Sequence, residues 1–186
     1  MATKIGEKNR LQIHAPLRLV QIVLLLVLTT IYLAPAKAQA SATGPSGLPL
    51  PRYVSLKSAR ANMRIGPGRD YRVKWLYLRP GLPMEVIQEF GNWRKVRDPE
   101  GNEGWILHSL LSGERTAIVA PWNSPDSVVV MRKEPVAEGP IAARLEPGVI
   151  ASVRDCAGDW CRLSTKGVRG FVDRRDLWGV YPDEDF

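Results

Sequence analysis

Residues 84–107, MEVIQEFGNWRKVRDPEGNEGWIL, contain the clearest indication of the fold. Short runs of β-forming residues alternate there with turn residues. Gly91-Asn92 can supply the positive φ of a tight hairpin, and residues 98–102, DPEGN, have the composition of a second turn. The stretch therefore predicts three consecutive antiparallel strands, at 84–90, 93–97 and 104–107.

The same pattern occurs a second time, 66 to 68 residues later. Gly91-Asn92-Trp93 matches Gly158-Asp159-Trp160, and Gly104-Trp105-Ile106 matches Gly170-Phe171-Val172. Three more matches keep the same order: Met63-Arg64 with Met131-Arg132, Leu78-Arg79-Pro80-Gly81 with Leu145-Glu146-Pro147-Gly148, and Leu111-Ser112-Gly113 with Leu177-Trp178-Gly179. Matches in order at nearly constant spacing indicate two copies of one unit. We place the copies at 53–118 and 119–181.

The chain after residue 40 has the pattern of an all-β protein. No stretch there keeps a helical period of 3.6 residues over three turns. Several short strands separated by turns predict a small antiparallel barrel or sandwich in each copy. Closure into a barrel would also remove exposed strand edges.

The motif Asn62-Met63-Arg64-Ile65-Gly66-Pro67-Gly68, with the later Gly-Asn-Trp and Gly-Trp-Ile, resembles the bacterial SH3-like (SH3b) domain family. The ending at 104–113 and the second copy's C-x-G-x-W-C element resemble small exported proteins with tandem domains of this kind. The resemblance covers residues 53–182 and implies two tandem small SH3-like barrels. The second copy departs from it, with Val130-Met131-Arg132-Lys133-Glu134-Pro135 in place of the first motif. Any ligand groove of the second barrel is therefore expected to differ.

The first 40 residues have the order of a secretory signal peptide. A basic segment, 1–18, precedes an apolar segment, 19–33, and small residues follow at 36–40. We predict cleavage after Ala38 or Ala40, and hence an exported protein in the periplasm or outside the cell. An apolar run of about 15 residues is shorter than the 20 or so of a membrane span, so we expect no stable membrane insertion after cleavage. Retention of the leader as an anchor is the alternative.

Three connecting segments complete the organisation. Residues 41–52 are rich in small residues and proline, which predicts a flexible linker. The join between the copies, Thr116 to Trp122, is short and apolar and favours a fixed arrangement of the two barrels. Residues 182–186 contain three acidic residues, and we expect a solvated acidic tail.

The formal net charge of +7 belongs largely to the leader. The first 38 residues hold five of the 26 basic residues and one of the 19 acidic residues, which leaves +3 for the rest. Nucleic-acid-binding proteins concentrate basic residues on one face of the folded part. The linear sequence shows no such cluster, so we expect no nucleic-acid partner.

Cys156 and Cys161 are the two cysteines of the chain, and they flank the second copy's hairpin turn. A four-residue gap across a hairpin brings the two Cα atoms within disulfide range, and export supplies an oxidising compartment. A redox pair usually has C-x-x-C spacing, and zinc would need two further ligands. We therefore predict a structural disulfide in preference to a redox or metal site.

No catalytic motif is present in the sequence: it lacks G-x-S-x-G, H-E-x-x-H and a P-loop. His108 is the one histidine after the leader. It comes directly after the predicted strand 104–107, at a position where the resemblance implies a short 3₁₀ turn. A catalytic histidine needs a nucleophile or an orienting carboxylate within reach. We predict that the chain is not an enzyme and that it holds no cofactor or metal.

Aromatic residues are the candidates for ligand contact. In barrels of this family such residues pack the core or line the groove between the first long loop and the hairpin loop. Core packing is the default expectation, because buried aromatic rings stabilise strongly. The groove candidates are Tyr71, Trp75, Tyr77, Trp93, Trp105 and Trp160.

The resemblance implies an exported, non-catalytic binding protein that attaches to peptidoglycan or its stem peptides through SH3-like grooves. Two weak sites on one chain would raise retention on a polymer. The alternative is an adaptor that binds an extended segment of another envelope protein through the same groove.

Overall fold

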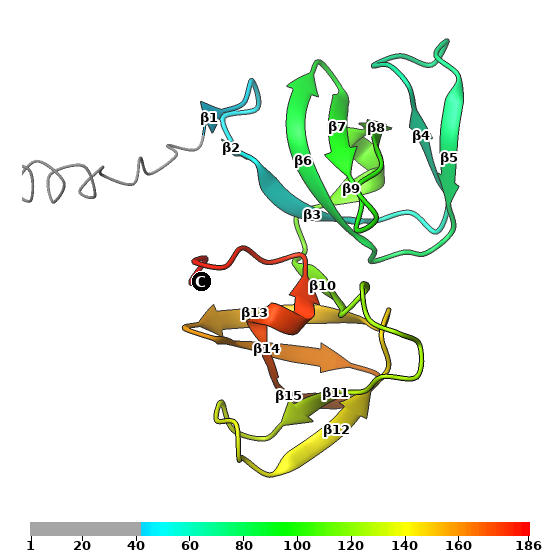
Figure 1. Ribbon diagram of the computed structural model, residues 1–186. Helices are drawn as coiled ribbons and strands as arrows, with labels where there is room; N and C mark the ends of the chain where they lie inside the picture. The colour runs from blue at the N-terminus through cyan, green and yellow to red at the C-terminus, as the bar shows by residue number, and fades with distance from the viewer. Residues whose placement is uncertain (1–41) are drawn as a thin grey trace, which may run out of the picture. The chain divides into compact units, whose positions relative to one another are not determined.

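Two seven-stranded antiparallel sheets follow one another along the chain (Figure 1). They are seen in a computed structural model that describes residues 42–186, so the predicted signal peptide, 1–40, lies outside the described residues. A small hairpin of β1 (Ala42–Thr43) and β2 (Pro49–Leu50) precedes the sheets. Within the described part the helical elements are two 3₁₀ turns of three residues each, and a membrane-spanning helix is not found among these residues. The all-β prediction is confirmed.

The first sheet forms a barrel with the spatial strand order β5-β4-β8-β7-β6-β3-β9. The strands predicted at 84–90, 93–97 and 104–107 are its β6, β7 and β8, and the predicted turns join them. Its elements are β3 (Arg52–Leu56), β4 (Ala61–Arg64), β5 (Val73–Tyr77), β6 (Pro83–Phe90), β7 (Trp93–Arg97), β8 (Glu103–Leu107), the 3₁₀ turn η1 (His108–Leu110) and β9 (Leu111–Ser112).

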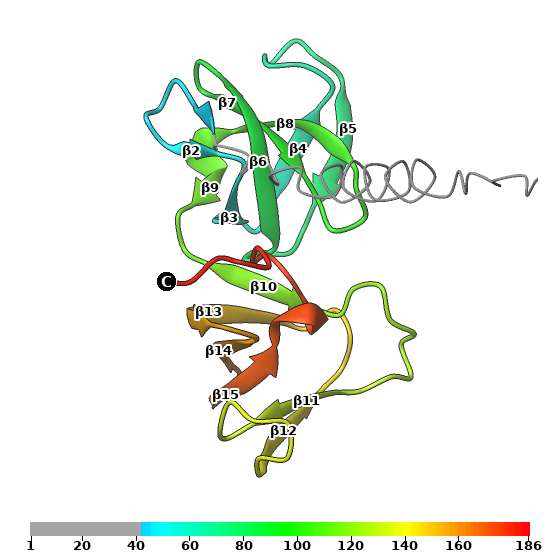
Figure 2. The same cartoon turned by 60° about the vertical axis from the view of Figure 1, so that its left-hand side comes forward.

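The second sheet repeats the first strand for strand (Figure 2). Its spatial order, β12-β11-β15-β14-β13-β10-β16, replaces each strand of the first barrel by its counterpart. The internal repeat therefore corresponds to two barrels of one topology. The elements are β10 (Thr116–Val119), β11 (Val129–Arg132), β12 (Ile141–Leu145), β13 (Ile150–Ala157), β14 (Trp160–Thr165), β15 (Val168–Asp173), the 3₁₀ turn η2 (Arg174–Asp176) and β16 (Leu177–Trp178).

The longest strand of each barrel bends at the same place. β6 and β13 have eight residues each. Their pairing with the next strand shifts register between Val86 and Gln88 and between Val153 and Asp155. A bulge of this kind bends a strand and increases its twist. One strand can therefore pair with both neighbours around the curve of the barrel.

Closure of each barrel depends on a glycine at a close approach of two strands. β8 meets β4, and β15 meets β11, through one residue pair each. A Cβ atom at Gly104 would lie 2.6 Å from Cγ of Met63 and 2.7 Å from the carbonyl oxygen of Arg64. A Cβ atom at Gly170 would lie 2.5 Å from the carbonyl oxygen of Arg132. The glycine of the repeated Gly-Trp-Ile and Gly-Phe-Val motifs is thus required for closure.

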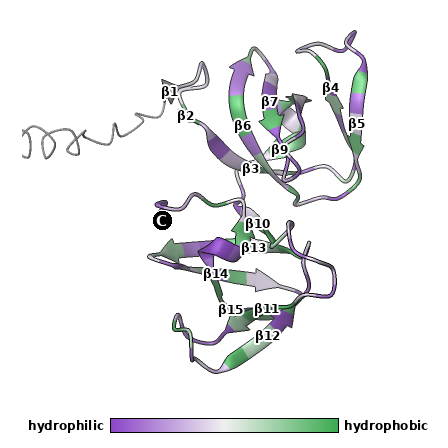
Figure 3. Cartoon of the chain, viewed as in Figure 1, coloured by the Kyte–Doolittle hydropathy of each residue, from purple (hydrophilic) through white to green (hydrophobic). Residues whose placement is uncertain are grey.

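The core of each barrel is aliphatic. Buried and half-buried positions alternate along strands such as β4 and β11, as expected for strands with one buried face. Figure 3 shows hydrophobic segments on the strands of both barrels. Each barrel buries one set of such side chains, in which valine, leucine, isoleucine and methionine dominate. Fully buried members include Leu56, Met63, Met84, Val86, Val96 and Ile106 in the first barrel and Val119, Met131, Cys161, Leu163 and Val172 in the second.

β10 lies between the two cores, and all four of its residues are buried. Ile118 belongs to the core of the first barrel, whereas Ala117 and Val119 belong to that of the second. The hydroxyl of Thr116 donates a hydrogen bond of 2.7 Å to the carbonyl of Gly81 in the first barrel. The boundary predicted between residues 118 and 119 falls inside this strand. Because both faces of this strand are buried, its sequence lacks the alternation of polar and apolar residues, and it could not be told apart from an apolar connecting segment.

The segment predicted as a flexible linker, 41–52, is held to the first barrel. The backbone N–H and the hydroxyl of Ser46 donate to the carboxylate of Glu89 at 2.8 and 2.7 Å. Arg52 and Arg94 bind the same carboxylate at 2.7 and 3.0 Å. Composition could not show this contact, because the partner of Ser46 lies 43 residues away along the chain.

The segment predicted as a solvated acidic tail, 182–186, is also bound to the fold. Glu184 forms a bidentate ion pair with Arg115. Phe186 and Cys156 exchange two backbone hydrogen bonds, of 3.2 and 3.3 Å. The acidic side chain of Glu184 therefore serves as an anchor rather than as a solvated charge.

The predicted disulfide is confirmed: Cys156 and Cys161 lie opposite each other on β13 and β14 and are bonded. In the first barrel the same two positions are Glu89 and Arg94, opposite each other on β6 and β7, and they form an ion pair. The hairpin is closed by a covalent bond in one barrel and by a pair of charges in the other.

Substitution of the closure glycines should destabilise the barrels. We expect Gly104→Ala and Gly170→Ala each to lower the free energy of unfolding by about 1–3 kcal/mol, because the added methyl group overpacks a contact with backbone. Guanidinium unfolding followed by tryptophan fluorescence measures this loss. Gly113→Ala is the matched control, since its Cβ would meet nothing within 4 Å. Equal effects at all three glycines would contradict the closure argument.

The N-terminal hairpin should detach in acid. Burial by itself raises the pKa of Glu89, but the hydrogen bonds from Arg52 and Ser46 outweigh it and lower this pKa from 4.5 to about 2. A carboxylate with a depressed folded-state pKa stabilises the fold above its unfolded pKa, and this contribution is lost as the pH falls toward the folded pKa. We therefore expect release of the hairpin between about pH 4.5 and pH 2.

An NMR titration of the Ser46 amide tests this release. Glu89→Gln should show the released shift already at neutral pH. Glu103→Gln is the control, since Glu103 makes its ion pairs with Lys95 and Arg97 instead. A Ser46 amide that does not move down to pH 2 would count against the anchor.

Loss of the disulfide should have a modest effect. Cys156→Ala/Cys161→Ala should lower the free energy of unfolding by about 2 kcal/mol, because so short a loop removes little entropy from the unfolded chain. Guanidinium unfolding of this variant beside the wild-type protein gives the difference. An undiminished stability would show that the hairpin does not need the bond.

Candidate binding site

A groove opens on the first barrel beside the long loop that joins β4 to β5. Its volume is about 320 Å³, at the lower end of the range for small-ligand sites. The wall is formed by β4 and the residue before it, by the loop, by the start of β7 and by the end of β8 with η1. The lining residues, which define the first-barrel groove, are Arg60, Asn62, Arg64, Arg69, Trp93, Leu107 and Leu110.

Strand alternation turns the polar residues of β4 toward the groove. Successive side chains of a strand point to opposite faces. Ala61 and Met63 are buried in the core, so Arg60, Asn62 and Arg64 face outward together. One wall of the groove therefore carries two guanidinium groups and an amide.

Trp93 and Leu107 form the apolar part of the wall. They are directly opposite each other at one end of β7 and β8. Paired residues of an antiparallel ladder share a face of the sheet. Both side chains are half-buried, and Leu110 from η1 completes this apolar surface.

The long loop is held in shape by contacts with its own residues. Nη1 of Arg64 donates a hydrogen bond of 2.6 Å to the carbonyl of Tyr71. The ring of Tyr71 covers Gly66, where an added Cβ would lie 2.4 Å from the ring. The Gly-Pro-Gly part of the motif is therefore a turn beneath an aromatic ring, and this turn carries Arg69 to the groove.

Of the six predicted aromatic residues, Trp93 alone is among the residues that line the first-barrel groove. Tyr71 and Trp75 are exposed by 48% and 47%, on the loop and on β5. Trp105 lies further along the outer face, opposite Lys95 on β7. Trp160 belongs to the second barrel.

Tyr77 has a structural role. Its hydroxyl donates a hydrogen bond of 2.8 Å to the carboxylate of Asp98, which is buried. Burial, together with this bond and the charge of Asp98, raises the pKa of Tyr77. Asp98 in turn accepts hydrogen bonds from the backbone and side chain of Asn102, so Tyr77 fixes the turn between β7 and β8.

The expectation that the aromatic residues pack the cores is met in part: of the six candidates, Tyr77 alone packs against a core cluster of the described residues. Trp93, Trp105, Trp160 and Phe171 are all half-buried, and the cluster of buried residues in each barrel contains no aromatic ring. A barrel of about 60 residues encloses little volume, and methionine and branched aliphatic side chains already fill it.

The arginines of the groove were missed as site residues. The alternation of Arg60, Asn62 and Arg64 with Ala61 and Met63 was the available signal for three of the lining residues. The loop conformation that brings Arg69 beside them has no such signal in the linear sequence. A second group of arginines, on the outer face of the second barrel, likewise comes from three separate strands. This second-barrel arginine cluster consists of Arg154, Arg162 and Arg169, around a hollow of about 390 Å³.

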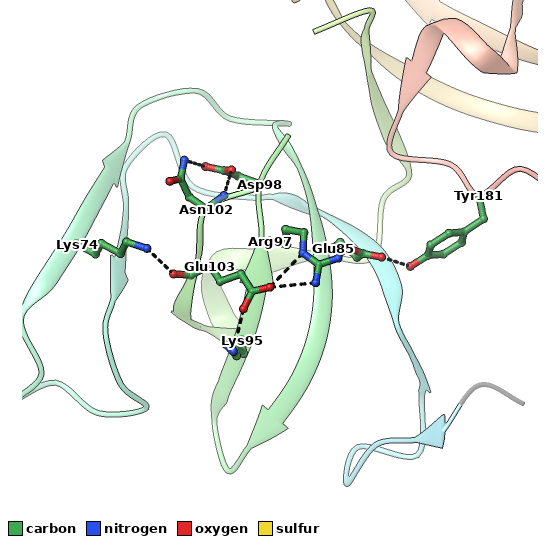
Figure 4. A network of polar contacts seen from close by, with 8 residues as sticks. All are labelled: Lys74, Glu85, Lys95, Arg97, Asp98, Asn102, Glu103 and Tyr181. Carbon is green, nitrogen blue, oxygen red and sulfur yellow. Dashed lines mark hydrogen bonds and ion pairs between the residues drawn. The ribbon is translucent and has the colours of Figure 1, made fainter. Parts of the chain in front are cut away.

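Next to the groove, the outer face of β7 and β8 carries a balanced network of charges (Figure 4). Lys95 and Arg97 bind the carboxylate of Glu103 at 2.9 and 3.0 Å, and Arg97 also binds Glu85 at 3.1 Å. Hydrogen bonds from Lys95 and Arg97 lower the pKa of Glu103. The hydroxyl of Tyr181 donates to Glu85 at 3.1 Å. The basic residues of this face are thus neutralised, in contrast to those of the groove.

The second barrel has different residues at the positions of the groove. The apolar pair Trp93–Leu107 becomes Trp160–Asp173, and Asp173 is bound to Arg175 at 2.7 Å. The hydrogen bond from Arg175 lowers the pKa of Asp173. Most of the other groove positions also differ. Arg60, Asn62 and Arg69 correspond to Val128, Val130 and Ala137, and Leu110 corresponds to Asp176, whereas Arg64 is matched by Arg132.

His108 lies in η1 as expected, exposed to solvent, and its backbone N–H donates to the carbonyl of Asn92 at 2.9 Å. Among residues 42–186 no three histidine, cysteine, aspartate or glutamate side chains gather into a group that could hold a metal ion. The chemistry that the groove offers is cationic and apolar contact.

Comparison with known proteins gives one curated relative and several solved structures. The "Putative N-acetylmuramoyl-L-alanine amidase YrvJ" of Bacillus subtilis (strain 168) is 26% identical over 117 residues, which are 60% of this chain and 22% of that protein. This chain therefore spans about a fifth of the relative's length. NlpC2 and NlpC1 from Trichomonas vaginalis are each 12% identical, with TM-scores of 0.33 and 0.32. They cover 73% and 76% of this chain, which covers 51% and 48% of them.

The family model of the bacterial SH3 domain matches the chain twice, at residues 57–113 and 126–179. Each match falls on one of the two barrels, and together they span more than half of the chain. The resemblance drawn from the Asn62–Gly68 motif and the Gly-Trp-Ile element is confirmed. The chain belongs to the bacterial SH3 domain family.

Proposed function

We propose that this protein is an exported, non-catalytic binding protein that associates with peptidoglycan or its stem peptides through the first-barrel groove. The observation that carries the proposal is the groove itself: an open site on a bacterial SH3 barrel, with Trp93 and Leu107 as an apolar wall beside arginines.

The groove has the composition of a site for an extended ligand. One aromatic side chain, Trp93, lines the groove, and its ring face suits an apolar side chain of a peptide as well as the apolar face of a sugar. Asn62 offers an amide that can both donate and accept hydrogen bonds. Stem peptides and glycan strands contain apolar groups that can pack on Trp93 and amide groups that can hydrogen-bond to Asn62.

The Bacillus subtilis relative supports the choice of polymer. Its name refers to N-acetylmuramoyl-L-alanine, the unit that joins glycan to peptide in peptidoglycan. This chain matches 22% of that protein. We infer that the shared part attaches the protein to the polymer, and that hydrolysis of the polymer is not a property of this chain.

Export follows from the leader. Its basic, apolar and small-residue segments have the order of a signal peptide, and peptidoglycan lies outside the cytoplasm. We propose cleavage after Ala38 or Ala40, which places the hairpin of β1 and β2, anchored on Glu89, near the start of the mature protein.

An adaptor that binds an extended segment of another envelope protein is the second candidate. β5 lies at one end of the strand order of the first sheet, and Val73, Trp75 and Leu76 on it are exposed. An edge strand with apolar side chains can accept a further strand from a partner. Proximity labelling in the exported compartment that finds one dominant protein partner would favour this candidate.

Removal of the Trp93 side chain from the groove should abolish most of the binding to peptidoglycan. We expect Trp93→Ala to weaken co-sedimentation with purified peptidoglycan about tenfold or more, because an aromatic anchor at the centre of a site contributes strongly. Trp160→Ala, at the equivalent position of the second barrel, is the matched control and should bind as the wild-type protein does.

Both variants must be shown to be folded by their thermal unfolding. Failure of the wild-type protein to sediment with peptidoglycan at low and moderate salt would refute the proposal and favour a protein partner. Equal losses in the two variants would show that the first-barrel groove is not the site.

A further inference from the structure

Comparison of the two barrels shows which groove arginines the long loop requires. Nη1 of Arg64 donates to the carbonyl of Tyr71 at 2.6 Å, and Nη1 of Arg132 donates to the carbonyl of Gly139 at 2.7 Å. The two loops have the same length, from 65 to 72 and from 133 to 140. An arginine at this position therefore holds the long loop in both barrels.

Arg60 and Arg69 have no such role. Both are exposed, and neither forms an ion pair with any of residues 42–186. Their counterparts in the second barrel are Val128 and Ala137, so the same loop forms without them. Two guanidinium groups that the fold does not require thus line the first-barrel groove.

No carboxylate is among the residues that line the first-barrel groove. Asp70, next to Arg69 in the sequence, is exposed but does not line it. In the second barrel, Asp173 and Asp176 occupy the positions of the lining residues Leu107 and Leu110. The first-barrel site is suited to an anion, whereas the second-barrel counterpart has one arginine, Arg132, and two aspartates at the equivalent positions.

We propose that the first-barrel groove recognises the free carboxylates of the stem peptide, with Arg60 and Arg69 on a carboxylate and Trp93 on the adjoining apolar part of the ligand. This inference rests on the proposed function and names the chemical group that the groove selects. The second barrel does not share this specificity.

Guanidinium groups suit this ligand because of their shape. Their planar set of N–H donors matches the two oxygens of a carboxylate, and such charge-assisted hydrogen bonds are stronger than neutral ones. Free carboxylates in peptidoglycan are carried by the stem peptides, so selection by charge directs the groove to the peptide and away from the uncharged sugars.

The test compares two double variants of the full protein that remove the same charge from different places. Arg60→Gln/Arg69→Gln changes the groove, whereas Arg154→Gln/Arg169→Gln changes the second-barrel arginine cluster. Neither pair includes the loop arginine Arg64. Thermal unfolding shows whether each variant is folded, and co-sedimentation with purified sacculi over a range of concentrations gives the apparent Kd.

The ligand is changed in parallel. Sacculi are used native, with their carboxylates converted to amides, and after removal of covalently attached phosphate-bearing polymers. We expect the groove variant to bind native sacculi roughly tenfold to a hundredfold more weakly, since it loses hydrogen bonds to a charged group. The cluster variant should stay within about threefold of the wild-type protein, as expected for screened surface charge. Amidation should weaken wild-type binding as much as the groove variant does, and should have little further effect on that variant.

Four outcomes would overturn the inference. Equal weakening of both variants would show a general attraction of positive charge to the wall. Wild-type binding that survives amidation of peptidoglycan, on sacculi without the phosphate-bearing polymers, would exclude carboxylate recognition and leave the proposed function standing. Binding that is lost when the phosphate-bearing polymers are removed would place the ligand in those polymers, and would refute the proposed function together with the inference. No binding of the wild-type protein to any sacculi would refute the proposed function itself.

Discussion

The fold depends on two close approaches of backbone, one in each barrel, that only glycine permits. Gly104 and Gly170 let β8 and β15 pass within reach of β4 and β11, where a methyl group would meet a carbonyl oxygen at 2.7 and 2.5 Å. These contacts join the β4–β5 hairpin and the β11–β12 hairpin to the rest of their sheets. Closure also brings the outer faces of β4, β7 and β8 together, and these strands supply most of the groove. The close contact at Gly104 thus helps to form the first-barrel groove.

The hairpin that follows the bulged strand has an attachment point at the same position in both barrels. In the first barrel Glu89 and Arg94 are opposite each other, and Glu89 also holds the N-terminal hairpin through Ser46. In the second barrel the disulfide of Cys156 takes the place of the charge pair, and the backbone of Cys156 binds Phe186. Both ends of the described chain are therefore tied to equivalent positions, by different chemistry. The carboxylate of Glu89 makes the first attachment sensitive to acid, and the second attachment is supported in addition by the carboxylate of Glu184, which is paired with Arg115.

The two barrels have kept the residues of the fold and changed those of the surface. The arginine that holds the long loop is present in both, and so is the closing glycine. Arg60 and Arg69 occur in the first barrel alone, and Asp173 and Asp176 replace leucines in the second. The excess of positive charge at the groove positions is therefore found in the first barrel and not at the equivalent positions of the second. On this basis we regard the first barrel as the ligand-binding copy and the second as a copy with a different surface.

The linear order of residues was enough to establish the repeat, the β6–β7–β8 strands with their turns and the disulfide, because each of these depends on neighbours in the chain or on strand alternation. The double burial of β10 and the anchoring of the two ends of the described residues on Glu89 and Arg115 depend on partners far away in the sequence, so local composition suggested a join, a linker and a tail. The same holds for the site. Trp93 could be recognised by its residue type, but only the folded long loop places Arg69 beside β4, and a cluster of charge that forms across a loop and a strand has no period in the sequence to reveal it.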